Sequence, residues 1–179
     1  MAMGGLVGLI TAGRMASAYE RPPHISAVYA SMEPGLPTGV HWIGDCRAYG
    51  WDGSLTLWSR DQTMGEWLRW NGGRTIEVVP LEVAETQDNW ARLGLAQATE
   101  ITCRQVEIPE DVSLVLLVSD GISDQVDLET AEALCREHAD APQSLADALV
   151  AAAEGEEEED TGELYRDDAT VVVLRRPTA

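Results

Sequence analysis

The chain has 179 residues, 45% of them hydrophobic, which is enough for one folded domain with a substantial core. It contains 31 acidic residues against 12 arginines and no lysine, and its formal net charge is −19. Because this charge repels phosphate backbones and anionic lipids, we expect neither nucleic acid nor a membrane as a partner.

The cysteines and the apolar runs bear on the cellular compartment. Cys46, Cys103 and Cys135 are odd in number, widely separated and without C-x-x-C spacing. This pattern argues against a disulfide framework or a thiolate zinc site and fits a reducing environment. No apolar run reaches the roughly 18 residues that a membrane span needs. We therefore expect a cytoplasmic protein.

The first part of the chain predicts a helix followed by strands. Residues 3–18 carry apolar side chains at helix-compatible spacing, although several glycines weaken the pattern. Strand signals follow at 25–32, 40–51 and 55–58. Between the last two, Asp52-Gly53 is the signal of a two-residue hairpin.

A second helix is predicted next, and a weakly patterned segment follows it. Thr63-Met64-Gly65-Glu66 has the spacing of a capping box, and Gly72 is a stop signal. Residues 72–98 give only weak signals, so we expect them to be irregular. Further strands are predicted at 101–108, 112–118 and 169–174.

Two consecutive helices and an acidic segment precede the last strand. Asp127 can cap a helix through about His138, and Pro142 can begin another through about Ala153. Residues 154–163 hold six glutamates and one aspartate, too much charge to pack, so they form a solvated loop or are disordered.

The order of these elements indicates an α+β fold in which helices cover antiparallel sheets. We expect a single domain over residues 1–179, with 154–163 as its acidic loop.

Three acidic motifs stand far apart in the sequence. They are Gly44-Asp45-Cys46-Arg47-Ala48-Tyr49, Val118-Ser119-Asp120-Gly121-Ile122-Ser123-Asp124 and Arg166-Asp167-Asp168-Ala169-Thr170-Val171. Asp120 follows the apolar run 114–118, Asp167 precedes the run 171–174, and Asp45 lies inside a strand-like segment. Carboxylates at strand ends are typical ligands of hard divalent cations and favour Mg²⁺ or Mn²⁺ over Zn²⁺. The residues therefore suggest an oxygen-ligand metal site with hydrolytic or phosphoryl chemistry.

The order of these motifs resembles that of the PPM-type (type 2C) metal-dependent protein phosphatases. The pattern G-D-x-R-A-Y, S-D-G-[IL]-x-D and D-[ND]-A-T-V-V runs in that order, and the similarity covers about Ile25 to Leu174. Leu57 to Thr63 is similar to the family's L-T-x-D-H-T stretch, with Gln62 in place of the usual His. The resemblance implies an α-β-β-α sandwich of antiparallel sheets flanked by helices.

The resemblance also implies a serine/threonine phosphoprotein phosphatase that uses two Mg²⁺ or Mn²⁺ ions. Two family motifs, R-x-x-N-x-D and D-G-x-G, are not found in the 179 residues. In the family, the first supplies an arginine for the substrate phosphate and the second an aspartate that bridges the metals. We therefore expect an N-terminally truncated or divergent member.

Asp120 and Asp167 are the strongest candidates for metal ligands, and we expect the three motifs to converge at one edge of the sheets. Taken without the family pattern, Asp120 could be an ordinary Asp-Gly turn. Asp167 could likewise be a loop residue that caps the turn into the last strand. Two carboxylates in one cleft repel unless a cation or a proton neutralises them.

Three further aspartates are weaker candidates. Asp45 and Asp124 match positions that the family uses for an additional, weakly held metal. Their alternatives are structural, because Asp124 could cap a turn and Asp45 could pair with Arg47 on the same strand face. Asp168 replaces the usual Asn of the third motif and is a possible substitute ligand.

These residues leave three functions open. The first is a phosphatase that hydrolyses phosphomonoesters by metal-activated water, with a phosphoprotein as substrate. The second is a catalytically inactive pseudophosphatase or gene fragment that binds a signalling partner. The third is a small acidic binding domain whose motif order is accidental.

Overall fold

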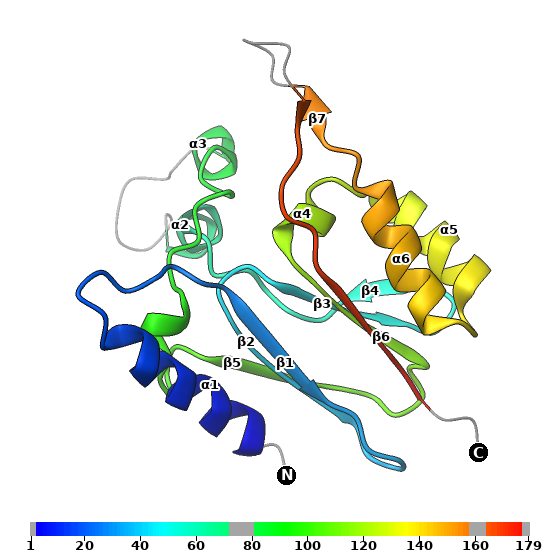
Figure 1. Ribbon diagram of the computed structural model, residues 1–179, viewed down its shortest axis with the longest axis horizontal. Coiled ribbons are helices and arrows are strands. Elements are labelled where there is room, and N and C mark those ends of the chain that lie inside the picture. The colour runs from blue at the N-terminus through cyan, green and yellow to red at the C-terminus, as the bar shows by residue number, and fades with distance from the viewer. Residues whose placement is uncertain (1–2, 72–80, 158–163, 177–179) are drawn as a thin grey trace. The chain divides into compact units, whose positions relative to one another are not determined.

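The computed structural model describes residues 3–71, 81–157 and 164–176 (Figure 1). Its contacts divide the chain into two compact units. Unit 1 comprises Met1–Tyr29, His41–Cys46 and Arg60–Gln105, and unit 2 comprises Ala30–Val40, Arg47–Ser59 and Val106–Ala179. The single domain expected over residues 1–179 stays a prediction.

A four-stranded antiparallel sheet forms the centre of unit 2. Its strands are β3 (Arg47–Trp51), β4 (Leu55–Leu57), β6 (Leu114–Val118) and β9 (Val171–Arg175), in the order β4-β3-β6-β9. All five residues of β6 are buried aliphatic side chains. A strand that is buried on both faces reads as a continuous apolar run, which is why this strand is easily recognised in the sequence.

Two helices pack on this sheet and complete the core of unit 2. They are α5 (Leu128–His138) and α6 (Pro142–Ala152), and they also pack against each other. Buried side chains of both helices meet alternate residues of β6 in one hydrophobic cluster, which includes Leu114, Leu116, Val118, Cys135, Leu145 and Leu149. Burial raises the pKa of the Cys135 thiol to about 11.

The two helices begin where the sequence predicts. The Asp127 carboxylate accepts a hydrogen bond from the backbone N–H of Thr130 at 2.8 Å, which makes Asp127 the N-cap of α5. Pro142 is in the first turn of α6, where its missing N–H costs nothing.

A single guanidinium ties the end of unit 2 to its loops. Arg176 follows β9 directly, and its side chain donates hydrogen bonds of 2.9 to 3.4 Å to oxygens of two separate segments, 33–38 and 109–112. Four acceptors are backbone carbonyls and one is a hydroxyl; they belong to Glu33, Leu36, Pro109, Val112 and Thr38.

A second, three-stranded sheet has the order β1-β2-β5. Its strands are β1 (Ala27–Ser31), β2 (Thr38–Ile43) and β5 (Arg104–Ile108). In unit 1, helix α1 (Met3–Ser17) packs on the short 3₁₀-helix η1 (Leu95–Gln97). Leu9, Ile43, Ala98 and Cys103 form the buried cluster beneath this helix.

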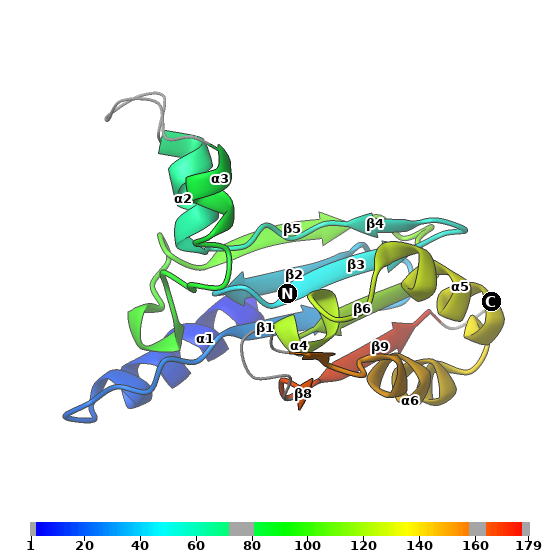
Figure 2. The ribbon, with the colours of Figure 1, turned by 90° about the horizontal axis from the view of Figure 1, so that it is seen from above.

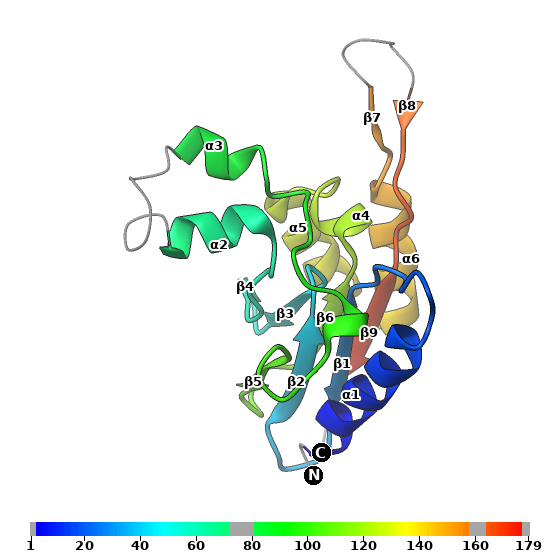
Figure 3. The ribbon, with the colours of Figure 1, turned by 90° about the vertical axis from the view of Figure 1, so that its left-hand side faces the viewer.

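Two further helices of unit 1, α2 (Met64–Asn71) and α3 (Leu81–Glu85), lie side by side (Figure 2, Figure 3). The Thr63 hydroxyl accepts a hydrogen bond from the Glu66 backbone N–H at 3.2 Å, so half of the predicted capping box is present. The Glu66 carboxylate instead pairs with Arg60 and Arg69. Arg69 also pairs with Asp88, which follows α3.

The single strand predicted over 40–51 is wrong. The strand is interrupted at Gly44, so that β2 and β3 are separate strands in different sheets. Asp45 lies in the interruption between them. Gly44 has φ +96°, and a Cβ placed on it would lie 2.1 Å from the Ser26 hydroxyl oxygen. Only glycine fits both constraints. Asp45 and Arg47 therefore do not share a strand face.

Three smaller expectations also change. The β3–β4 hairpin has three loop residues, 52–54, because Trp51 pairs with Leu55. The stretch 81–98, expected to be irregular, contains α3 and η1. Within the acidic segment, Glu156–Glu157 (β7) pair with Leu164–Tyr165 (β8).

Residues 72–80 of the stretch expected to be irregular and residues 158–163 of the acidic segment lie outside the described residues.

The α+β fold class with antiparallel sheets flanked by helices is confirmed. None of the helices in the described ranges has the length and apolar character required to cross a membrane.

His41 on β2 is a buried histidine. Its side chain is 2% exposed, and neither ring nitrogen forms a hydrogen bond with any residue in the described parts of the chain. Burial lowers the pKa of His41 below its usual value of 6.5, and the nearby Gln105 side chain acts in the opposite direction. Folding therefore disfavours the protonated form of this ring.

We predict that the protein loses stability as the pH falls below about 6.5, because the unfolded chain then binds a proton at His41 that the folded protein does not. The loss through this residue is at most about 1.4 kcal/mol at pH 5.5. Urea denaturation at pH 7.5 and 5.5 measures it. His41→Leu should remove this part of the pH dependence, and an equal loss in the variant would contradict the assignment.

Candidate functional site

Asp120 stands at the C-terminal end of β6. It is the first residue of the short helix α4 (Asp120–Ser123) and is half-buried. One oxygen of its carboxylate accepts a hydrogen bond from the Gly121 backbone N–H at 3.0 Å, which fixes the direction of the side chain.

Asp167 and Asp168 lie in the segment that leads into β9. The Asp167 carboxylate accepts a hydrogen bond from the Asp168 backbone N–H at 2.8 Å and is half-buried, whereas Asp168 is exposed. Because β6 and β9 are antiparallel with Val118 opposite Val171, the end of β6 lies beside the start of β9. The register thus brings the second and third motifs to the same edge of the sheet.

Ser119 joins these two motifs through three hydrogen bonds. Its backbone N–H donates to the Thr170 carbonyl at 3.0 Å, and its hydroxyl oxygen accepts from the Thr170 N–H at 3.0 Å. The same hydroxyl donates to the Asp168 carbonyl at 3.2 Å. Figure 1 shows the result, with α4 beside the chain that enters β9.

Gly121 allows the two segments to come this close. A Cβ on Gly121 would lie 2.5 Å from the Asp168 carbonyl oxygen, although the φ of this glycine is not in the left-handed region. The glycine of the S-D-G motif is therefore required by the approach of the third motif, not by a special backbone conformation.

Asp124 has a positively charged partner in unit 2. The Arg47 guanidinium lies 3.6 Å from the Asp124 carboxylate and donates a hydrogen bond to the Ser123 carbonyl at 3.4 Å. Arg47 reaches this position from β3, where it is paired with Val118. Asp124 as a ligand of an additional metal stays a prediction.

Asp45 belongs to unit 1 and is held by Ser26. The Ser26 hydroxyl donates to the Asp45 carboxylate at 2.5 Å, and the Asp45 backbone N–H points to the same hydroxyl oxygen at 3.3 Å. The first motif is thus divided, because Asp45 is part of unit 1 and Arg47 part of unit 2.

Gln62 has a structural role that its sequence pattern did not reveal. It is 8% exposed, and its side chain accepts from the Gly44 N–H at 2.8 Å and donates to the Thr102 carbonyl at 2.7 Å. Its backbone N–H donates to the Gly44 carbonyl, and its carbonyl accepts from the Arg92 N–H. A side-chain amide can donate and accept hydrogen bonds at the same time. The glutamine at this position is therefore the sequence signal that could have indicated a residue that bridges backbone groups.

Within the described residues, no three His, Cys, Asp or Glu side chains lie close enough together to hold a metal ion. The assignment of Asp120, Asp167, Asp45 and Asp124 as ligands of Mg²⁺ or Mn²⁺ therefore stays a prediction, as does Asp168 as a substitute.

A family model decides the membership of this chain. The model described as stage II sporulation protein E matches residues 76–177, more than half of the sequence. The chain belongs to this family. Together with the structural similarities below, the match confirms the PPM-type family that the motifs resemble.

Solved structures of bacterial phosphatases share the fold of this stage II sporulation protein E family member. The PPM Ser-Thr phosphatase MsPP from Mycobacterium smegmatis is 19% identical with a TM-score of 0.68, over 95% of this chain and 70% of that one. The Mycobacterium tuberculosis serine/threonine phosphatase PstP/Ppp is 24% identical with a TM-score of 0.59, over 96% and 67%. A search by sequence among curated proteins finds no match.

A third solved structure with the same fold is the catalytic domain of PstP in complex with two manganese ions. It is 22% identical with a TM-score of 0.57, over 94% of this chain and 66% of that one.

We predict that Gly121→Ala destabilises unit 2 by about 1–3 kcal/mol, since the new methyl group must displace the Asp168 backbone. Urea denaturation measures the change in the free energy of unfolding. Gly8→Ala is the matched control: it lies on the exposed side of α1 with no atom within 4 Å, and it should be neutral or stabilising by up to about 1 kcal/mol. Equal stability of the two variants would show that the two motifs are not in contact.

Proposed function

We propose that this chain is a metal-dependent phosphoprotein phosphatase domain that hydrolyses phosphoserine and phosphothreonine. Asp120 and Asp167 are its proposed ligands for Mg²⁺ or Mn²⁺. The observation that carries the proposal is the set of Ser119 hydrogen bonds, which holds the two carboxylate-bearing segments together at one end of β6 and β9.

The chemistry of the two side chains fits a hard cation. Both offer carboxylate oxygens, both are partly exposed, and each is oriented by the backbone N–H of the next residue. Mg²⁺ retains several waters and is commonly bound through only one or two carboxylates, so two aspartates can hold it weakly. A divalent cation, when bound, neutralises charge on a phosphoryl group and acidifies its coordinated water.

The other aspartates have narrower proposed roles. Asp168 is exposed beside Asp167 and adds negative charge at the strand ends. Asp124 would have to exchange Arg47 for a metal, and Asp45 already has its orientation fixed by Ser26. The manganese ions named for the PstP catalytic domain support a metal of this kind.

The proposed substrate is a phosphoprotein, and the proposed compartment is the cytoplasm. Cys46, Cys103 and Cys135 form no disulfide with one another, which supports a reducing environment.

Partner binding without hydrolysis is a second candidate function. It is favoured by the lack of a cluster of three ligating side chains in the described parts of the chain. The R-x-x-N-x-D and D-G-x-G motifs, which are not found in residues 1–179, point the same way. Positioning and charge stabilisation supply most of the catalysis in phosphoryl transfer, so turnover by these residues should be slow.

We predict that residues 1–179 bind Mn²⁺ weakly in calorimetric titrations. Asp120→Ala and Asp167→Ala should each lower the affinity by more than the roughly tenfold that loss of an outer-shell partner costs. Hydrolysis of a phosphothreonine peptide should depend on Mn²⁺ and disappear in Asp167→Ala.

Asp111→Ala is the matched control, because it removes one exposed carboxylate from the turn between β5 and β6. Its affinity and turnover should equal those of the unaltered chain. Mn²⁺ binding without hydrolysis would favour the second candidate. Binding that survives both Asp120→Ala and Asp167→Ala would contradict the metal assignment itself.

A further inference from the structure

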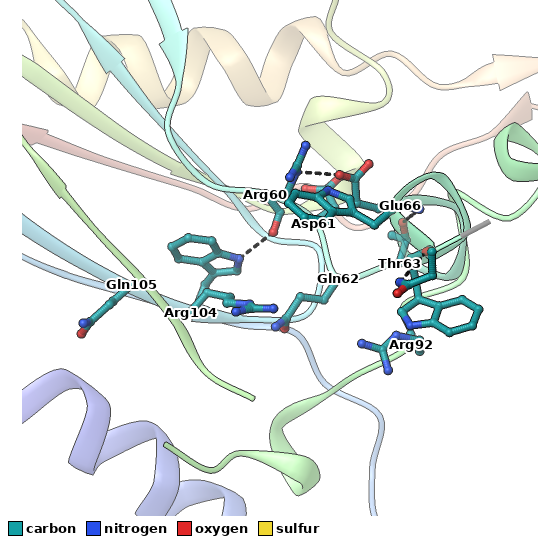
Figure 4. A pocket seen from close by; sticks show the side chains of 12 residues that line it. Arg60, Asp61, Gln62, Thr63, Glu66, Arg92, Arg104 and Gln105 are labelled. Atoms are coloured by element: carbon teal, nitrogen blue, oxygen red, sulfur yellow. Dashed lines mark hydrogen bonds and ion pairs between the residues drawn. The ribbon is translucent and has the colours of Figure 1, made fainter. Parts of the chain in front are cut away.

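Unit 1 contains a pocket of about 620 Å³ that the proposed function does not use (Figure 4). Its walls come from β2, the loop 60–63, helix α2, Arg92 and the start of β5, all of them within unit 1. Pockets of roughly 300–1,000 Å³ are the size that takes small organic ligands.

The charge of this pocket is the reverse of that of the protein. Three of the chain's 12 arginines, Arg60, Arg92 and Arg104, line it, in a sequence whose formal net charge is −19. Arginine is the residue best suited to carboxylate and phosphate oxygens, because its planar fork can donate two hydrogen bonds to one group.

One of the three arginines is already engaged. The Arg60 side chain pairs with Glu66 at 2.6 Å and lies over the Trp70 ring, 4.6 Å from its centroid. Glu66, in turn, also pairs with Arg69. Asp61, the other acid of the lining, is half-buried and likewise not free. The ion pairs of Glu66 are therefore with Arg60 and Arg69, not with the two remaining arginines of the pocket.

Arg92 and Arg104 have no such partner. Both are exposed, and neither guanidinium forms an ion pair or a hydrogen bond with any residue in the part of the chain that the structure describes. Figure 4 shows the Arg104 side chain extending in the direction of Gln62. An unpaired guanidinium in a concave site attracts an oxyanion, since its hydrogen-bond donors lack protein acceptors.

One buried residue, Gln62, holds the backbone of Arg92 and the backbone just before Arg104. The Arg92 N–H donates to the Gln62 carbonyl at 2.9 Å, and the Gln62 side chain donates to the carbonyl of Thr102, two residues before Arg104. The free guanidinium groups thus project from an ordered framework, which reduces the entropy lost when a ligand binds.

The uncharged part of the lining combines polar side chains with three indole rings. Trp42, Trp67 and Trp70 contribute to the pocket. The Trp42 indole N–H donates to the Arg60 carbonyl at 2.8 Å, so this ring has no free polar group to offer a ligand. Indole faces favour flat organic rings and stack on them.

From these observations we propose that the pocket binds an organic phosphate that carries a flat ring, of the nucleoside monophosphate class. Arg92 and Arg104 recognise the phosphate, and the ring lies against Trp67 and Trp70, the two indoles of the lining that are not buried. The inference does not rest on the proposed phosphatase activity, because no residue of the pocket is one of the proposed metal ligands. It is also compatible with the expectation that nucleic acid is not a partner, since a mononucleotide brings one phosphate to a local positive site.

Adenosine 5′-monophosphate is the probe, titrated calorimetrically into the whole chain in EDTA so that no divalent cation contributes. Adenosine and inorganic phosphate are titrated separately under the same conditions. The nucleotide should bind at least about tenfold more tightly than either, and each of Arg92→Gln and Arg104→Gln should weaken it by about tenfold. Arg21→Gln, the matched control, removes an exposed arginine outside the pocket and should change nothing.

The six tryptophan indole N–H resonances give a second readout. The nucleotide should shift those of Trp42, Trp67 and Trp70 and leave those of Trp51 and Trp58 unchanged. Unaltered affinity in the Arg92→Gln, Arg104→Gln double variant would overturn the site. Inorganic phosphate that binds as tightly as the nucleotide would overturn the flat-ring ligand. Neither result would affect the manganese experiments, which use other residues.

Discussion

The pairing of β6 on both of its edges is the constraint on which the candidate site depends. Five aliphatic residues are buried in a row, with β3 on one side and β9 on the other. A slip of one residue would turn every side chain of the strand to the opposite face. Because a shift in the register of β6 is energetically unfavourable, the residues after Val118 leave the sheet at one defined point. Ser119 meets Thr170 there, and the two aspartate segments meet with it.

The sequence predicts the parts of this structure that local chemistry determines, and it fails where distant residues decide. The buried run of β6, the Asp127 cap and Pro142 each carry their signal within a few residues, and all three are where they were expected. The break at Gly44 depends on Ser26, which no local pattern identifies. Gln62 looked like a lost histidine, but its hydrogen-bond partners lie 18 and 40 positions away in the sequence. No local sequence pattern indicates that the Gly44–Tyr49 motif is divided between two units either.

Scarce positive charge explains much of how the surface is organised. Every cation in this chain is a guanidinium, and several of them neutralise nearby acids: Arg47 with Asp124, Arg60 with Glu66, Arg69 with Asp88 and Arg175 with Asp140. Exposed pairs of this kind contribute little stability individually, about 0–1 kcal/mol. Their effect is to lower the repulsion within a strongly acidic protein. An arginine that remains unpaired in such a chain therefore indicates an anion-binding site more strongly than a paired arginine does.

The acceptors of Arg176 have a consequence for how freely the surrounding loops can vary. Four of its five partners are main-chain carbonyls, and every amino acid carries that group. Substitutions of Glu33, Leu36 or Val112 leave the acceptor in place as long as the backbone path is kept. The guanidinium itself has no such substitute, because lysine has a single ammonium and cannot span two loops. The arrangement concentrates sequence restriction on one position and leaves two loops open to change.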